Sequence, residues 1–180
     1  KKLLIPVLAL AIGALSACGT AEDDKTTSSD QTSGKQVLVV GTSADYAPFE
    51  FVDTAVSDEI VGFDIDLANL IATELDYELE FVNADFNSLI PGLQADKYDV
   101  VIAGMTPTKD RDEVVDFSIP YYETEQYMVF PKDSDFASLE DLSGKLVGAQ
   151  VSSIQEELAK TLATEHSFKV ESRNLIPELI

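Results

Sequence analysis

A length of 180 residues allows one domain or two small ones, and 45% hydrophobic with 25% charged residues is the balance of a globular protein. The formal net charge of −21, from 33 acidic and 12 basic residues, argues against a nucleic-acid backbone as a partner. The single cysteine excludes a disulfide within the chain, and the single histidine argues against a histidine metal site or a Ser-His-Asp triad.

The N-terminal residues 1–17 have the pattern of a secretory signal peptide. Lys1 and Lys2 precede an apolar run, 3–15, that is too short for a typical membrane-spanning helix. The sequence Leu-Ser-Ala-Cys at 15–18 resembles the lipobox of bacterial lipoproteins, in which the cysteine is lipidated and becomes the mature N-terminus. We therefore expect Cys18 to be a lipid anchor. The alternative is an ordinary signal peptide followed by an incidental cysteine.

Residues 18–35 are mostly polar and show no apolar periodicity, so we expect a flexible tether. Folded sequence begins near Gln36 with a buried strand at 37–40. The loop 42–49 follows the carboxyl end of this strand, which is the usual ligand side of an open α/β sheet. Two further short segments, 50–52 and 60–61, are predicted to pair around a turn.

A helix is predicted over 62–75. Its apolar face is expected to consist of four residues, Leu67, Leu70, Ile71 and Leu75. Asp64 and Asp66 fall in its first turn, where the helix dipole favours carboxylates. We prefer this dipole role over acid/base or metal chemistry for the two residues.

The next predicted elements are a strand at 77–82, a short helix at 86–93 and a strand at 100–103 that is buried on both faces. Thr108 is a plausible N-cap, which places Arg111 in the first turn of a helix. The dipole disfavours a cation there, so an anion such as a carboxylate is expected nearby. The alternative is a surface arginine, balanced by three neighbouring acidic residues, Asp110, Asp112 and Glu113.

Residues 117–122 are predicted to cover a sheet edge, and 125–130 to be extended. Polar residues after 130 suggest a domain boundary, followed by a single turn at 139–142, a strand at 145–150, a helix at 154–163 and a strand at 168–171. The repeated β-α-β order implies a mostly parallel sheet. We expect an α/β domain over 36–130 and part of a second over 131–180. Because the sequence ends at a helix start with no closing strand, we also expect a fragment.

Several blocks together resemble one family, the extracytoplasmic solute-binding proteins (family 3) of polar amino-acid ABC importers. They are 62–67 (Gly-Phe-Asp-Ile-Asp-Leu) with Ile71, Ala72 and Leu75, and the segments 42–49, 89–93, 106–111 and 148–150. The resemblance implies a periplasmic-binding-protein-like type II fold. In that fold two α/β lobes close on a ligand about a hinge, and the second lobe would be incomplete here.

The resemblance also implies a ligand site. Arg111 would bind the α-carboxylate, the Gly104 carbonyl would accept from the α-ammonium, and Tyr46 and Phe86 would flank the side chain. The loop 151–155 would add donors, although it departs from the usual Gly-Ser/Thr-Thr pattern. The expected ligand-binding residues are Ser43, Asp45, Tyr46, Phe86, Ala103, Gly104, Met105, Thr106, Arg111, Ser153 and Gln155.

The function that this resemblance implies is a lipid-anchored receptor on the extracytoplasmic face of the cell membrane. It would deliver a free amino acid, polar or basic, to the transmembrane permease of an ABC importer, with no cofactor, metal, catalytic residue or nucleic acid. One alternative is an enzyme on the same scaffold, resembling cyclohexadienyl dehydratases, with Asp45 or Asp85 as the general acid. Another is a ligand-sensing module.

Overall fold

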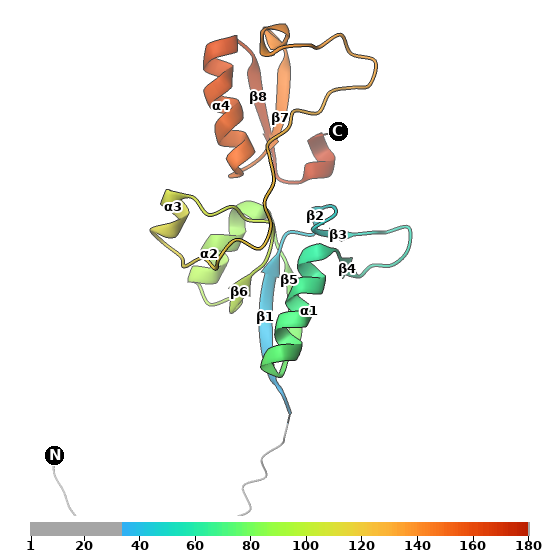
Figure 1. Ribbon diagram of the computed structural model, residues 1–180, viewed down its shortest axis with the longest axis vertical. Coiled ribbons are helices and arrows are strands. Elements are labelled where there is room, and N and C mark those ends of the chain that lie inside the picture. The colour runs from blue at the N-terminus through green and yellow to red at the C-terminus, as the bar shows by residue number, and fades with distance from the viewer. Residues whose placement is uncertain (1–33, 180) are drawn as a thin grey trace, which may run out of the picture. The chain divides into compact units, whose positions relative to one another are not determined.

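Three parallel strands organise the first part of the chain in the computed structural model, which describes residues 34–179 (Figure 1). β1 (Gln36–Thr42) lies between β5 (Tyr77–Asn83) and β6 (Val100–Val101), and it pairs in parallel with both. The register of β1 with β5 runs from Gln36↔Tyr77 to Thr42↔Asn83. The carboxyl ends of these strands therefore meet at the same edge of the sheet, and the loops that follow them are neighbours.

β6 is shorter and more exposed than predicted. The sequence suggested a strand over 100–103 buried on both faces, but only Val100–Val101 is regular, and both residues are half-buried at the sheet edge. The Ile102 amide still donates to the Gly41 carbonyl at 3.0 Å. The ladder ends there because the chain turns at Gly104, whose φ of 50° lies in the left-handed region that favours glycine.

Helices pack on both sides of this sheet (Figure 1). α1 (Phe63–Leu75) contacts β5, whereas α2 (Leu89–Gln94), which follows the 3₁₀ turn η1 (Phe86–Ser88), contacts β1 and β6. The buried centre on the α2 side is formed by Leu89, Tyr98 and Ala103. The predicted strand at 77–82 and helix at 86–93 are thus present with small shifts of their ends.

The buried face of α1 differs from the predicted one. Leu70 is 69% exposed and Leu75 is 57% exposed, whereas Ile65, Ala68 and Ala72 are buried. Small side chains at i+3 and i+7 let the helix approach the sheet closely. Asp64 is buried as well and accepts hydrogen bonds from Gly104 and Tyr121. These contacts favour a rotation of the helix that leaves the larger leucines exposed.

A separate antiparallel sheet follows β1. It contains β2 (Asp45–Tyr46), β3 (Glu50–Val52) and β4 (Ile60–Val61) in that order. β3 pairs with β4 as predicted, through Phe51↔Val61 and Val52↔Ile60. Residues 50–52 therefore return beside the loop that leaves β1.

α3 (Lys109–Asp112) has the predicted N-cap, because the Thr108 hydroxyl accepts from the Arg111 amide at 3.3 Å. For the segment 117–122, predicted to cover a sheet edge, the contacts that the structure shows are aromatic. Tyr121 stacks on Phe63 at the start of α1, with ring centroids 6.2 Å apart. Aromatic contacts thus place Tyr121 at the start of α1.

The C-terminal part of the described chain is a β-α-β unit. β7 (Leu146–Gln150) pairs in parallel with β8 (Lys169–Arg173), and α4 (Ile154–His166) packs against both. It is preceded by η2 (Leu139–Leu142), the predicted single turn, and followed by η3 (Ile176–Leu179). α4 extends three residues beyond the predicted end at 163.

Residues 34–179 belong to one compact unit that begins at Gly34, and the proposed division after residue 130 remains a prediction. The signal peptide, Cys18 and the polar tether up to residue 33 lie outside the described residues. Within the described range, no helix combines the length and apolar character needed to span a bilayer.

Candidate functional site

The candidate residues gather where the parallel strands end. Ser43, Asp45 and Tyr46 follow β1, Phe86 follows β5, and the segment 103–106 follows β6. Because these strands are adjacent and parallel, the structure brings the three loops to one edge, as open α/β sheets do at their ligand-binding ends. Ala103 is buried in the core, and Met105 packs against the same cluster.

Arg111 lies between two loops that are distant in sequence. One guanidinium nitrogen, Nη1, donates to the Thr106 carbonyl at 2.6 Å, and Nη2 donates to the Ser152 carbonyl at 2.8 Å. The guanidinium carbon is also 5.5 Å from the centre of the Phe86 ring, within cation–π range. The side chain is thus held by neutral groups from three parts of the chain.

The charge of Arg111 has no carboxylate bound to it. Among residues 34–179 it forms no ion pair, so Asp110, Asp112 and Glu113 do not balance it in the way the surface-arginine alternative requires. Burial lowers the pKa of the Arg111 guanidinium, and the more distant charge of Glu157 partly opposes that shift. A half-buried cation with only carbonyl partners favours an anion beside it.

Gly104 is fixed by contacts on both sides. Its amide donates to Oδ2 of Asp64 at 2.6 Å. A side chain at this position would place its Cβ 3.1 Å from the Tyr46 ring. Glycine is therefore needed both for the positive φ and for the close approach of Tyr46 to the backbone.

Asp45 joins the loop after β1 to the C-terminal unit. Its Oδ2 accepts from the Ile176 amide at 2.7 Å and from the Gln150 side-chain amide at 3.2 Å. The Ser43 hydroxyl also donates to Oδ1 of Asp45 at 3.2 Å. Both oxygens of Asp45 thus have protein donors, and the side chain links three segments of the chain.

Ser153 has a structural role that the sequence did not predict. Its hydroxyl accepts from the Glu156 amide at 3.1 Å, as an N-cap of α4, and donates to the Gln150 carbonyl at 2.7 Å. The group is 8% exposed and its hydrogen-bonding capacity is largely used. Gln155, in the first turn of α4, is exposed. Ligand contacts for both residues stay predictions.

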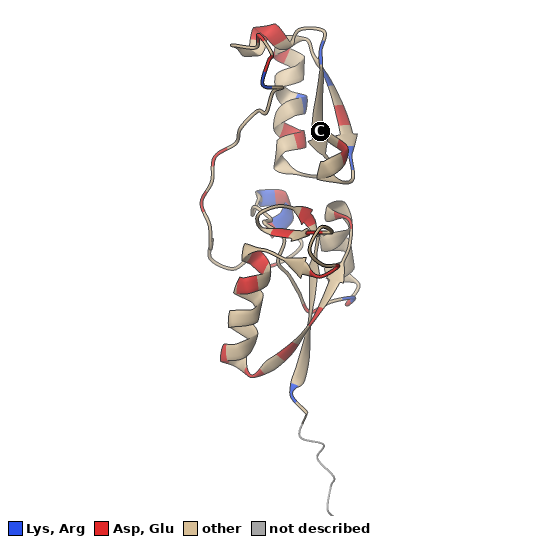
Figure 2. Ribbon diagram, turned by 90° about the vertical axis from the view of Figure 1, so that its right-hand side faces the viewer, with Lys and Arg blue, Asp and Glu red and all other residues tan. Residues whose placement is uncertain are grey.

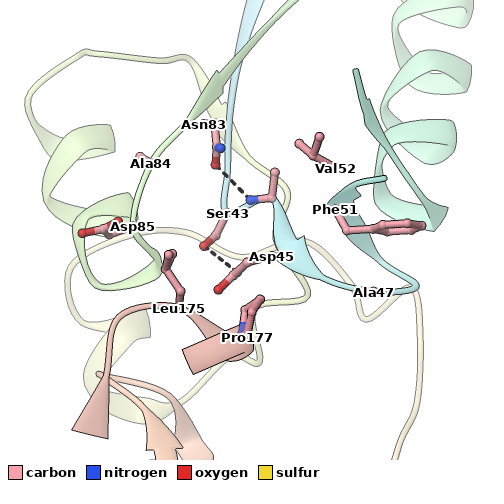
Figure 3. Close-up of a pocket in the computed structure, with 11 residues that line it drawn as sticks. Ser43, Asp45, Ala47, Phe51, Val52, Asn83, Ala84, Asp85, Leu175 and Pro177 are labelled. Atoms are coloured by element: carbon pink, nitrogen blue, oxygen red, sulfur yellow. Dashed lines mark hydrogen bonds between the residues drawn. The ribbon is translucent and has the colours of Figure 1, made fainter. Parts of the chain in front are cut away.

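A pocket of about 500 Å³ lies beside these residues. Figure 3 shows Ser43 and Asp45 facing the segment that carries Leu175 and Pro177. Its lining residues are Ser43, Ala44, Asp45, Ala47, Phe51, Val52, Asn83, Ala84, Asp85, Leu175 and Pro177. The loops after β1 and β5 both contribute to it, through 43–45 and 84–85. Arg111, Phe86 and the segment 103–106 do not line it, so the pocket adjoins the Arg111 site and does not contain it.

Two groups beneath the site were not singled out as functional from the sequence. Asp64 is fully buried and accepts from Gly104 and from the Tyr121 hydroxyl, at 2.6 and 2.9 Å. Glu50 is also fully buried, and burial, followed by the nearby Asp64 carboxylate, raises the pKa of Glu50 to about 10. The sequence indicated only a helix-dipole role for Asp64, because it lies in the first turn of a helix. For Glu50, no feature of the neighbouring sequence distinguished it from an exposed glutamate.

Charge is distributed unevenly over the elements. Figure 2 shows acidic residues and no basic residue on α1, whereas α3 carries both kinds. The basic residues of α3 are Lys109 and Arg111. Two basic side chains of this acidic protein thus lie on the short helix that follows the candidate segment 103–106, together with the acidic Asp110 and Asp112.

Comparison with known proteins identifies relatives of the chain. The profile of a family described as "Bacterial extracellular solute-binding proteins, family 3" matches residues 38–167. The arginine-binding extracellular protein ArtP of Bacillus subtilis (strain 168) is 47% identical over 180 residues, which is all of this chain and 67% of the relative.

Solved structures give the same result. An ancestral arginine-binding protein bound to arginine is 46% identical, with a TM-score of 0.75 over 80% of this chain and 63% of that one. The ancestral amino-acid-binding protein AncCDT-1, a precursor of cyclohexadienyl dehydratase, is 38% identical, with a TM-score of 0.74 over 79% and 63% of the two chains. These matches confirm the predicted α/β fold of the periplasmic-binding-protein type II class. The chain spans about two thirds of the length of these relatives.

Proposed function

Because the chain belongs to the bacterial extracellular solute-binding proteins, family 3, we propose that it binds a free amino acid at the site around Arg111. The α-carboxylate binds the Arg111 guanidinium, and Tyr46 and Phe86 flank the ligand side chain. A polar or basic amino acid is the expected ligand. The names of the relatives, which bind arginine, support the basic class.

The observation that carries this proposal is the environment of Arg111. Its guanidinium is half-buried, stacks on Phe86 and donates to two carbonyls, while no carboxylate neutralises it within the described residues. A ligand carboxylate supplies the missing charge, and a guanidinium can bind it through two parallel hydrogen bonds. Ligand binding at this position also bridges the loop after β6 to the loop after β7.

The experiment is a ligand screen followed by a test of Arg111. Thermal shift of the full-length protein with each of the twenty amino acids identifies the ligand, and titration calorimetry then measures its affinity. Arg111→Ala removes the charge-assisted partner and should cost about 2–5 kcal/mol, or roughly 30-fold to several-thousand-fold in Kd. Arg111→Lys should recover only part of this, because an ammonium cannot reproduce the two-pronged geometry.

A matched control is Lys109→Ala, since Lys109 is an exposed cation of the same short helix. Its loss should leave the affinity within about 0.5 kcal/mol of wild type. If a folded Arg111→Ala variant binds as tightly as Lys109→Ala, the carboxylate lies elsewhere and the proposed site is wrong.

An enzyme on the same scaffold is the second candidate, and the similarity to a precursor of cyclohexadienyl dehydratase is what supports it. The contacts of Asp45 weigh against it as a general acid, because both of its oxygens accept hydrogen bonds from protein donors. A general acid needs a free path to the substrate, and these contacts occupy both oxygens. Recovery of the bound ligand unchanged after release supports binding alone, whereas a converted product supports an enzyme.

The remaining parts of the proposal concern the whole protein. It acts outside the cytoplasm, held to the membrane through Cys18, and passes its ligand to the permease of an ABC importer. The family description supports the extracellular location. Cross-linking of the loaded protein to a co-expressed permease tests the partner, and equal recovery of the permease with an unrelated lipoprotein would contradict it.

A further inference from the structure

Two fully buried carboxyl groups lie under the candidate site with unpaired oxygens. Glu50 of β3 and Asp64 of α1 are both 0% exposed. Oε1 and Oε2 of Glu50 and Oδ1 of Asp64 have no hydrogen-bond partner among the described residues. Buried polar atoms are almost always paired, so three such oxygens in two neighbouring groups need a common explanation.

The two carboxyl groups differ in their donors. Oδ2 of Asp64 accepts from the Gly104 amide at 2.6 Å and from the Tyr121 hydroxyl at 2.9 Å. One oxygen of Asp64 therefore has two protein donors. Glu50 has no such donor, so one proton shared between the groups resides on Glu50. Its hydroxyl can then donate to Asp64 Oδ1, which pairs an oxygen of each group.

The charges that face Glu50 favour the same assignment. They are Asp64 of α1, Asp45 and Tyr46 of β2, and Tyr121 of the segment after α3. Each is negative or neutral, and no cation faces Glu50 among residues 34–179. Burial first, and then Asp64, raises the pKa of Glu50 to about 10, whereas burial and Asp64 raise the pKa of Tyr121 so that it remains a donor.

We propose that Glu50 is a positioning residue for ligand binding: as a neutral acid it donates to Asp64, and the Asp64 anion fixes the Gly104 backbone. This inference rests on the proposed function, because it concerns the backbone that faces the ligand. Gly104 is held at φ 50°, beside the Tyr46 ring and with its amide directed at Asp64. Glu50 and Asp64 therefore determine the direction of the Gly104 carbonyl, which is the expected acceptor for the ligand ammonium.

The proton on Glu50 makes stability depend on pH in a known direction. The folded protein binds this proton, whereas the unfolded chain releases it above the ordinary glutamate pKa of 4.5. The stabilisation is complete below that value and is lost as pH rises toward the folded value of about 10. For one proton, the unfolding equilibrium constant rises by about tenfold per pH unit in this window.

The first test needs no ligand. Chemical denaturation of full-length wild type, Glu50→Gln and Glu59→Gln is measured at pH 6, 7, 8 and 9. Glu50→Gln keeps a donor that does not titrate, so between pH 6 and 9 wild type should lose about 1,000-fold in folding equilibrium relative to it. Glu59 is exposed on the same antiparallel sheet region, and its variant should follow wild type. Parallel profiles for wild type and Glu50→Gln would overturn the proton assignment.

A direct measurement covers the case in which the glutamine variant does not fold. The side-chain carboxyl carbon of Glu50 is followed by NMR in wild type from pH 4 to 9. A signal that stays in the protonated range up to pH 8 supports the proposal, and a titration near 4.5 overturns it.

The second test concerns the ligand site, with arginine and glutamine as probes. Glu50→Leu removes the donor to Asp64 and should weaken binding of whichever probe binds wild type by at least tenfold. Glu50→Gln should recover most of that loss. If Glu50→Gln instead loses arginine alone, the Glu50 carboxylate contacts the ligand cation directly and the positioning role is wrong. If neither probe binds wild type and the screen of the twenty amino acids also finds no ligand, the proposed function fails. The ligand-free pH profile still tests the proton on Glu50 in that case.

Discussion

At the residue scale, the buried Tyr98 ring can occupy its position only because its neighbour Gly92 has no side chain. Its hydroxyl donates to the Ser88 and Leu89 carbonyls, at 3.1 and 2.9 Å, and so holds η1 to the start of α2. The ring passes so close to Gly92 that an added Cβ would lie 2.0 Å from the hydroxyl oxygen. Since Phe86 belongs to the same turn, this packing also places a candidate ligand residue.

Gly92→Ala should therefore destabilise the protein although alanine is the better helix former. Overpacking costs about 1–3 kcal/mol, against a gain of about 1 kcal/mol in helix propensity. Urea unfolding of Gly92→Ala, Tyr98→Phe and the double variant measures the coupling. Tyr98→Phe alone should cost about 1 kcal/mol, and the double variant should be more stable than the two losses added together. A Gly92→Ala variant as stable as wild type would contradict the close approach.

At the scale of elements, the start of α4 determines how the C-terminal unit meets the candidate site. Ser153 caps α4 and binds the Gln150 carbonyl, while the adjacent Ser152 carbonyl accepts from Arg111. The cap thus fixes the loop that contacts Arg111. Ser153, which the resemblance predicts to bind the ligand, thus has a role in shaping this loop, and its ligand contact stays a prediction.

Ser153→Ala should lower the stability of α4 by about 1 kcal/mol, within a range of about 0.5–2, because the Glu156 amide loses its acceptor. Hydrogen exchange of the α4 amides reports this locally, and Ser153→Thr, which keeps a hydroxyl, should restore most of the protection. The arrangement is contradicted if exchange in α4 is the same in Ser153→Ala and wild type.

At the scale of the whole molecule, the net charge of −21 bears on how the protein can be held at a membrane. An acidic protein is repelled by anionic lipid headgroups, so charge alone does not hold it at a membrane. Attachment through Cys18 would supply more than one acyl chain, which suffices for stable anchoring where a single chain does not.

Cys18→Ala should therefore release the protein from cells. Wild type should sediment with membranes and the variant should appear in the medium or the soluble extracellular fraction. Ser16→Ala, which keeps the cysteine, is the control and should remain bound. Equal partitioning of wild type and Cys18→Ala would show that the cysteine is incidental.

The sequence by itself determined most of the element order and the family. Apolar runs and turn residues located β1, β5, α4 and the β3–β4 pair, and Thr108 marked the start of α3, because these features depend on neighbours in sequence. The spaced blocks from residue 42 to 150 indicated the family that the profile comparison then matched over 38–167.

Only the tertiary structure decided which faces are buried and which polar groups meet. Leucines on α1 are exposed while Asp64 is buried, because contacts with Gly104 and Tyr121, 40 and 57 residues away, outweigh local amphipathicity. The partners of Arg111 likewise join distant segments, and the burial of Glu50 near Asp64 comes from packing between elements. Periodicity describes one element at a time, whereas burial and pKa depend on what packs against it from the rest of the chain.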